Sequence, residues 1–164
     1  SAQAARPQTC QALSSLPSPD PATDPAAHPA DPLWGSPARD IDPEETALGA
    51  DPRLQQAIAL FNQGEWYGCH DGFEELWHET QGPLRPLLQG VLQVAVARLH
   101  LERGNHRGAT VLLGEGLGRL QRCGPRDLDL DVDALRRDLR PWLAALQNGG
   151  SLEGLPPLRL IRLG

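Results

Sequence analysis

The sequence predicts an all-α protein, a four- to five-helix antiparallel bundle that follows an extended N-terminal arm rich in proline and alanine. Apolar residues recur at helical spacing through most of the chain, and cap signals separate the runs. Nothing alternates with the period of a strand before the short LRLIRL tail. We therefore expect an arm over residues 1–43, one helical domain over residues 44–149 and an extended tail over residues 150–164.

The arm is predicted from its composition. Residues 1–43 hold nine of the sixteen prolines and few large apolar side chains, so burial cannot offset the entropy of ordering them. A flexible arm is therefore expected. Leu33 and Trp34 are its exceptions, and they are candidates for anchoring it in a groove of the domain.

The charge lies mostly at the N-terminus. Of the formal charge of −6, residues 1–50 contribute seven acidic against two basic side chains, and the rest contributes fourteen against thirteen. A nearly neutral domain has no long-range field, so we expect neither nucleic acid nor a membrane as partner. An unidentified small molecule or protein is expected instead, and a homo-oligomer stays open.

Cysteine spacing and hydropathy point to the cytoplasm. Cys10, Cys69 and Cys123 have no paired spacing, the N-terminus has no secretory pattern, and no run of ~18 apolar residues exists. The sequence has no lysine or methionine, which indicates a GC-rich genome.

The helices are expected in series. Asp51-Pro52 is an N-cap followed by proline at the first helical position, and Gly64 can end that helix. A second helix runs from about Glu65 to Thr80, where Gly82-Pro83 provides a break. The remaining helices are expected over about 83–103, 105–122 and 131–148.

Two of these helices have unusual composition. The 83–103 segment is apolar on nearly every face, so it belongs in the centre of the bundle. The 105–122 segment holds four glycines, each of which costs up to ~1 kcal/mol inside a helix. Small residues at this density indicate close contact with a neighbouring helix.

The stretch CHDGFEELWHE, residues 69–79, carries the densest polar signal. On a helix, His70, Glu74 and Trp77 lie within about 60° of one another. Gln89, Gln93 and His100 share a face of the apolar helix, where a buried amide without a partner costs ~1–3 kcal/mol. We expect the acids and His70 to face Gln93 across two antiparallel helices, with residue 70 near 93 or 97.

The run from Phe61 to Leu113 resembles the domain of unknown function 309 family. The resemblance covers residues from about 53 to 146 and rests on four motifs: F-N-x-G-x-W from Phe61, H-D-x-F-E-E-x-W from His70, R-x-x-L-Q-G-x-x-Q-x-A-x-A-x-x-H from Arg85, and R-G-N-x-x-G-A from Arg103. Asp71 and Phe73 stand where that family usually has Glu and Leu. The resemblance implies a small all-helical fold, a bacterial source and the family's label of metal-dependent hydrolase.

A metal centre has a physical basis in the same residues. HDGFE has the geometry of H-E-x-x-H with the last residue changed to glutamate. His70, Glu74 and His100 are then the candidate ligands of a divalent metal, Zn or Mn, and Asp71 and Glu74 are the candidate catalytic carboxylates. The polar pocket around them is predicted to contain Trp66, Glu75, Trp77, Arg85, Gln89, Gln93, Arg103 and Asn105.

Two other patterns in this stretch, for a di-iron site and for a cysteine nucleophile, are weaker than the pattern for a single metal ion. Glu75-x-x-His78 would be half of a di-iron site, but the glutamines of the facing helix argue against it. Cys69 and His70 point about 100° apart, which disfavours a nucleophile and base. Three hypotheses remain: a metal-dependent hydrolase, a non-catalytic ligand- or protein-binding module, and a hydrogen-bond network that only fixes helix packing.

Overall fold

A computed structural model describes residues 42–163. The chain divides into two units, Ser1–Asp42 and Pro43–Gly164, and the second contains six helices among the described residues. These are α2 Pro43–Ala50, α3 Pro52–Asn62, α4 Trp66–Glu79, α5 Arg85–Glu102, α6 His106–Leu120 and α7 Val132–Asn148. The predicted all-α bundle is confirmed. The predicted arm, with Leu33 and Trp34, falls almost wholly outside the described residues.

Side-chain caps begin three of the described helices, α3, α6 and α7, and Asp51 is the cap predicted for α3. The Asp51 side chain accepts from the Arg53 amide before α3, and Asn105 accepts from the Gly108 amide before α6. The Asp131 side chain accepts from the Ala134 amide at the start of α7. Gly149 ends α7 at φ 66°, a left-handed conformation that glycine adopts without steric cost.

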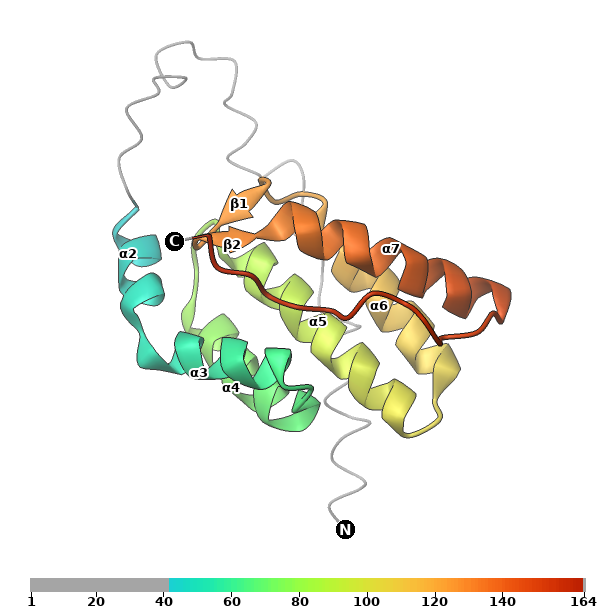
Figure 1. Ribbon diagram of the computed structural model, residues 1–164. Coiled ribbons are helices and arrows are strands. Elements are labelled where there is room, and N and C mark those ends of the chain that lie inside the picture. Colours follow the sequence, from blue (N-terminus) through green and yellow to red (C-terminus); the bar gives the residue numbers. More distant parts are fainter. Residues whose placement is uncertain (1–41, 164) are drawn as a thin grey trace. The chain divides into compact units, whose positions relative to one another are not determined.

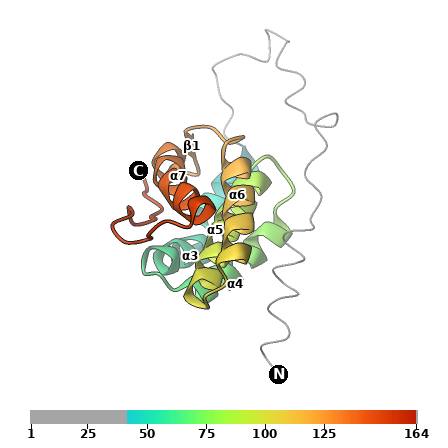
Figure 2. The same cartoon turned by 90° about the vertical axis from the view of Figure 1, so that its right-hand side faces the viewer.

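Helix α5 lies at the centre, as its apolar composition predicts, and helices that follow one another from α3 to α7 pack together (Figures 1 and 2). The Arg85 guanidinium lies 4.3 Å from the centroid of the Trp77 ring, and Arg98 lies 5.2 Å from Trp66. These contacts confirm that α4 and α5 run antiparallel, with residue 70 near the level of residue 93.

Helices α5 and α6 approach each other most closely at two glycines. A Cβ atom built on Gly116 would lie 3.0 Å from the carbonyl oxygen of Gly90, and one on Gly90 would lie 2.9 Å from the Leu120 side chain. The predicted close contact of the glycine-rich helix is therefore with α5. This crossing sets the register in which polar side chains of α5 and α6 meet.

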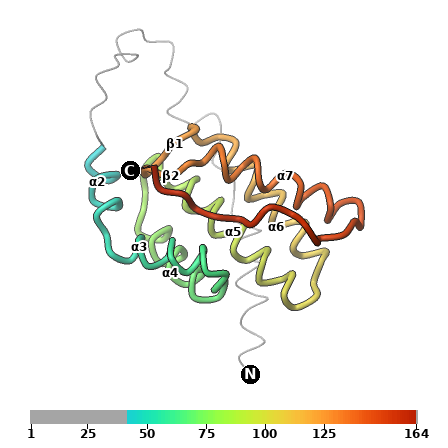
Figure 3. Tube along the Cα trace, viewed as in Figure 1, coloured from blue at the N-terminus to red at the C-terminus, as the bar shows by residue number. Residues whose placement is uncertain are grey.

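The C-terminal segment returns along the bundle from α7 toward β2 (Figure 3). Strands β1 (Arg126–Asp127) and β2 (Leu130–Asp131) form a small antiparallel hairpin, and Arg162 bridges to Leu130. Asn62 of α3 both donates to and accepts from the backbone of Leu160. None of the described helices is both long and apolar enough to cross a membrane.

Candidate functional site: a polar seam between two helices

His70 is buried in α4, with 8 % of its surface exposed. Its Nδ1 lies 3.1 Å from Asp71 Oδ1, and its Nε2 lies 3.4 Å from Glu74 Oε2. Both polar neighbours come from the same helix, one at the next position and one a turn later. The imidazole therefore lies between two carboxylates and is held locally within α4.

The third predicted metal ligand, His100, does not join His70, Asp71 and Glu74. His100 is half-buried and its Nδ1 bonds to Asn105 Nδ2 at 3.0 Å, so it belongs to the turn that joins α5 and α6. Within residues 42–163, no group of three or more His, Cys, Asp or Glu side chains is arranged to hold a metal ion. The set His70, Glu74 and His100 thus does not fit the three protein ligands of a catalytic zinc site.

Other members of the predicted pocket stabilise the bundle elsewhere. Glu75 pairs with Arg53 of α3 at 2.7 Å on the exposed side of α4. Trp66 packs edge-on against Phe61, with ring centroids 5.0 Å apart. Arg103 is exposed at the C-terminal end of α5. Glu75, Trp66 and Arg103 therefore lie outside the polar contacts described below.

Gln93 is the centre of a different polar cluster. It is fully buried at 0 % exposure, and its Nε2 donates to Glu115 Oε1 of α6 at 2.9 Å. The prediction that its partner lies on α4, opposite His70, is wrong. The two helices do lie at the predicted level, but the Gln93 side chain faces α6, where Gly116 leaves room for it.

Gln89 and Arg119 continue this cluster by one turn. Because α5 and α6 are antiparallel, the residue one turn before Gln93 on α5 lies level with the residue one turn after Glu115 on α6. The close approach of Gly90 to Leu120 agrees with this register. We therefore infer that Gln89 and Arg119 lie at the same level of the two helices. We call these four residues, Gln89, Gln93, Glu115 and Arg119, the polar seam.

Several polar atoms of the seam are buried without a partner. Gln89 Nε2, Gln93 Oε1 and Arg119 Nε each expose less than 1 Å² and accept or donate no hydrogen bond within the described part of the chain. The indole Nε1 of Trp77 is the fourth such atom. Trp77 stacks on Arg85, which lies one turn before Gln89 on the same face of α5, so the indole flanks the seam.

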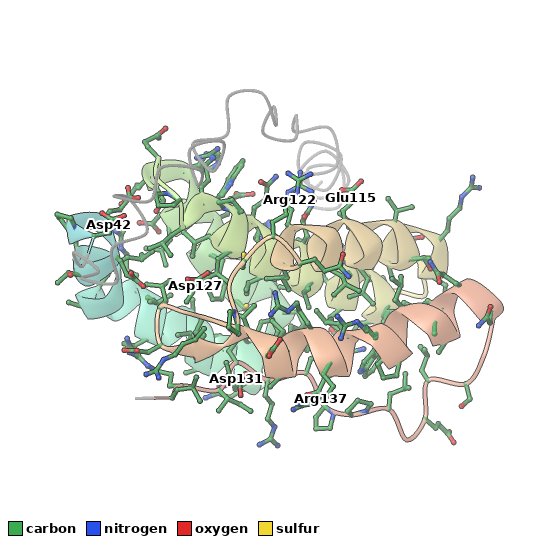
Figure 4. All side chains as sticks on the ribbon, turned by 90° about the horizontal axis from the view of Figure 1, so that it is seen from above. Asp42, Glu115, Arg122, Asp127, Asp131 and Arg137 are labelled. Atoms are coloured by element: carbon green, nitrogen blue, oxygen red, sulfur yellow. The ribbon has the colours of Figure 1, made fainter. Side chains whose placement is uncertain are left out.

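Burial shifts the pKa values of both charged members of the seam. It raises the pKa of the Glu115 carboxyl, against the charge of Arg119 and the bond from Gln93, which lower it. Burial also lowers the pKa of Arg119, and the charge of Arg122 adds to that effect. Figure 4 shows Glu115 and Arg122 on the side of α6 that is turned away from α7.

Glu115 and Arg119 were not predicted from the sequence. Gln93 was expected to need a polar partner, and the glycines of residues 105–122 were expected to need a close neighbour, but the two expectations were not combined. Glu115 precedes Gly116 directly, so a glycine face pressed against α5 carries a carboxylate at its edge. That combination is the signal that could have found the seam.

Comparison with known proteins gives a family but no activity. No curated protein matches the chain. The model of the family described as "Domain of unknown function (DUF309)" matches residues 54–112, which span α3, α4, α5 and the first half of α6. The match includes His70, Glu74, Gln89 and Gln93 and stops just before Glu115. Over these residues the chain is therefore similar to the DUF309 family, whose function is unknown.

Proposed function

We propose that this domain is a non-catalytic binding module that holds a small polar ligand at the polar seam. One observation carries the proposal: four buried polar atoms on the neighbouring helices α4, α5 and α6 have no partner among the described residues. Each such atom costs about 1–3 kcal/mol when it is left unpaired. A ligand that pairs with them recovers that free energy on binding.

A purely structural network explains these atoms less well. A buried polar network stabilises a fold when all its members are satisfied, and an apolar side chain serves better than a half-satisfied amide. The seam contains one internal bond, from Gln93 to Glu115, and leaves the Gln89 amide nitrogen without one. Residues that violate local packing rules are characteristic of binding sites.

The hydrolase interpretation has one supporting observation, the imidazole of His70 between Asp71 and Glu74. It would need a third ligand from another element, which His100 does not supply because it bonds to Asn105. A Zn or Mn ion at His70 stays a prediction of the family resemblance. Elemental analysis of protein purified without chelator or affinity metal tests it directly.

The substitution Gln89→Leu distinguishes a ligand-binding role of the Gln89 amide from a structural role. If the amide serves a ligand, leucine removes an unpaired polar group from an apolar helix, so the melting temperature stays the same or rises. Ligand-induced thermal shifts, measured over a panel of small carboxylates, amides and phosphates, should disappear in the same variant.

The matched control is Gln56→Leu, which changes an exposed glutamine of α3 and should alter neither quantity. A Gln89→Leu protein that melts several degrees lower would show that the amide holds the helices together, and the binding proposal would then be abandoned.

A further inference from the structure

This inference rests on the proposed function and names the ligand class. We propose that the polar seam binds a small carboxylate that carries a hydroxyl or amino group about one helical turn away from the carboxylate. The unpartnered atoms include three donors, at Trp77, Gln89 and Arg119, and one acceptor, at Gln93. Three donors and one acceptor match a ligand with several acceptor oxygens and one donor.

The carboxylate end is assigned to Gln89 and Arg119. The guanidinium is a planar fork, and its Nε–H with a neighbouring Nη–H binds the two oxygens of a carboxylate in parallel. Arg119 Nε has no partner among the described residues, and the unpartnered Gln89 Nε2, inferred to lie at the same level, adds a neutral donor. These two groups come from different helices, so an anion between them also bridges α5 and α6.

The local charges favour an anion at this end. The positive charge of Arg122, two residues beyond the end of α6, helps to lower the pKa of Arg119, which indicates that the two cations repel each other. A carboxylate beside Arg119 relieves that repulsion. On α5, Arg85 adds a further positive charge one turn from Gln89. The acid of the seam, Glu115, lies toward the other end, beside Gln93.

The donor end is assigned to Gln93. The amide nitrogen of Gln93 donates the bond to Glu115. That bond fixes the orientation of the amide and leaves Oε1 as an acceptor with no partner in the described chain. Residues 89 and 93 are separated by four residues, about 6 Å along the helix axis, which sets the length of the ligand.

Titrations of the full chain, followed by NMR chemical shifts, test the assignment with five probes: 4-hydroxybutyrate, butyrate, glycolate, 4-hydroxybutanamide and inorganic phosphate. We expect 4-hydroxybutyrate, whose hydroxyl lies four bonds from the carboxyl carbon, to bind about tenfold tighter than butyrate or glycolate. The neutral analogue 4-hydroxybutanamide should bind weakly because it lacks the charge that Arg119 recognises.

Two variants locate the two ends. Arg119→Gln should weaken both butyrate and 4-hydroxybutyrate about tenfold. Gln93→Leu should remove the advantage of the hydroxyl and leave butyrate affinity unchanged. Arg137→Gln, which alters an exposed arginine of α7, is the control and should change neither affinity.

Two results would overturn the ligand class, and they are distinguishable from failure of the proposed function. If 4-hydroxybutanamide or inorganic phosphate binds, the carboxylates do not, and Gln89→Leu abolishes that binding, then the seam binds ligands of another class. If none of these probes shifts a resonance, the ligand class is wrong, and if Gln89→Leu also lowers the melting temperature, the proposed function fails with it.

Discussion

Glu115 is a residue whose burial makes the stability of the protein depend on pH. Its carboxyl accepts from the fully buried Gln93, and burial raises its pKa above the ordinary value of 4.5 despite the charge of Arg119. The folded protein therefore holds this proton more tightly than the unfolded chain does. The contribution of Glu115 to stability is greatest at acidic pH and is lost as the pH rises through the folded-state pKa.

Glu115→Gln tests this linkage. Glutamine keeps an oxygen that can accept from Gln93 but cannot ionise. The free energy of unfolding of the wild type, relative to that of the variant, should fall as the pH is raised from 4 toward neutrality. Urea unfolding at a series of pH values measures the difference. A difference that grows with pH would show that Glu115 is stabilised as the anion.

The candidate site was predictable at the level of single residues only in part. Gln93 stands among apolar neighbours, so its need for a polar partner can be read from sequence. The identity of that partner cannot, because a residue on a central helix can face any of its neighbours. The bond to Glu115 depends on the rotation of α5 about its axis, which the whole bundle determines.

At the scale of elements, caps and breaks made the helix boundaries predictable. The five expected helices agree with α3 to α7 within a few residues, since each has its own start or stop signal. The short helix α2 was missed because Pro43–Ala50 buries only Leu48 and so has no apolar periodicity. The β1–β2 hairpin was missed as well, since two-residue strands leave no alternating pattern.

From the crossing of α5 and α6 we predict opposite changes in stability when two glycines of α6 are replaced by alanine. In Gly116→Ala the new Cβ would lie 3.0 Å from the backbone oxygen of Gly90, so the helices must separate. We expect a loss of about 1–3 kcal/mol, as for overpacked cores. A Cβ atom added at Gly118 would meet nothing within 4 Å, so Gly118→Ala should gain about 0.5–1 kcal/mol through helix propensity.

Chemical denaturation of both variants measures these changes. Separation of the helices at residue 116 should also stretch the bond between Gln93 and Glu115, so Gly116→Ala should shift the NMR signal of the Gln93 side-chain amide, whereas Gly118→Ala should not. Equal stabilities for the two variants would contradict the close approach.

At the scale of the whole molecule, the C-terminal segment connects parts of the fold that are far apart in sequence. Pro156 accepts from the Trp142 indole of α7, Leu160 is bonded by Asn62 of α3, and Ile161 accepts from the amide of Asp131 in β2. The sequence predicted an extended tail and no more. Extended segments without periodicity do not reveal what they contact, because their hydrogen bonds are made to distant residues.

Two adjacent residues of this segment test whether it holds the fold together. Leu160 is buried at 4 % exposure, whereas Ile161 is 45 % exposed, although both keep their backbone hydrogen bonds when the side chain is truncated. Leu160→Ala should cost about 2–3 kcal/mol through lost burial and the cavity left behind. Ile161→Ala should stay within about 0.5 kcal/mol of wild type.

Urea midpoints provide the comparison. Asn62→Ala, which leaves the amide and carbonyl of Leu160 unpaired, should lower the midpoint about as much as Leu160→Ala. If all three variants match the wild type, the segment lies on a bundle that is stable without it.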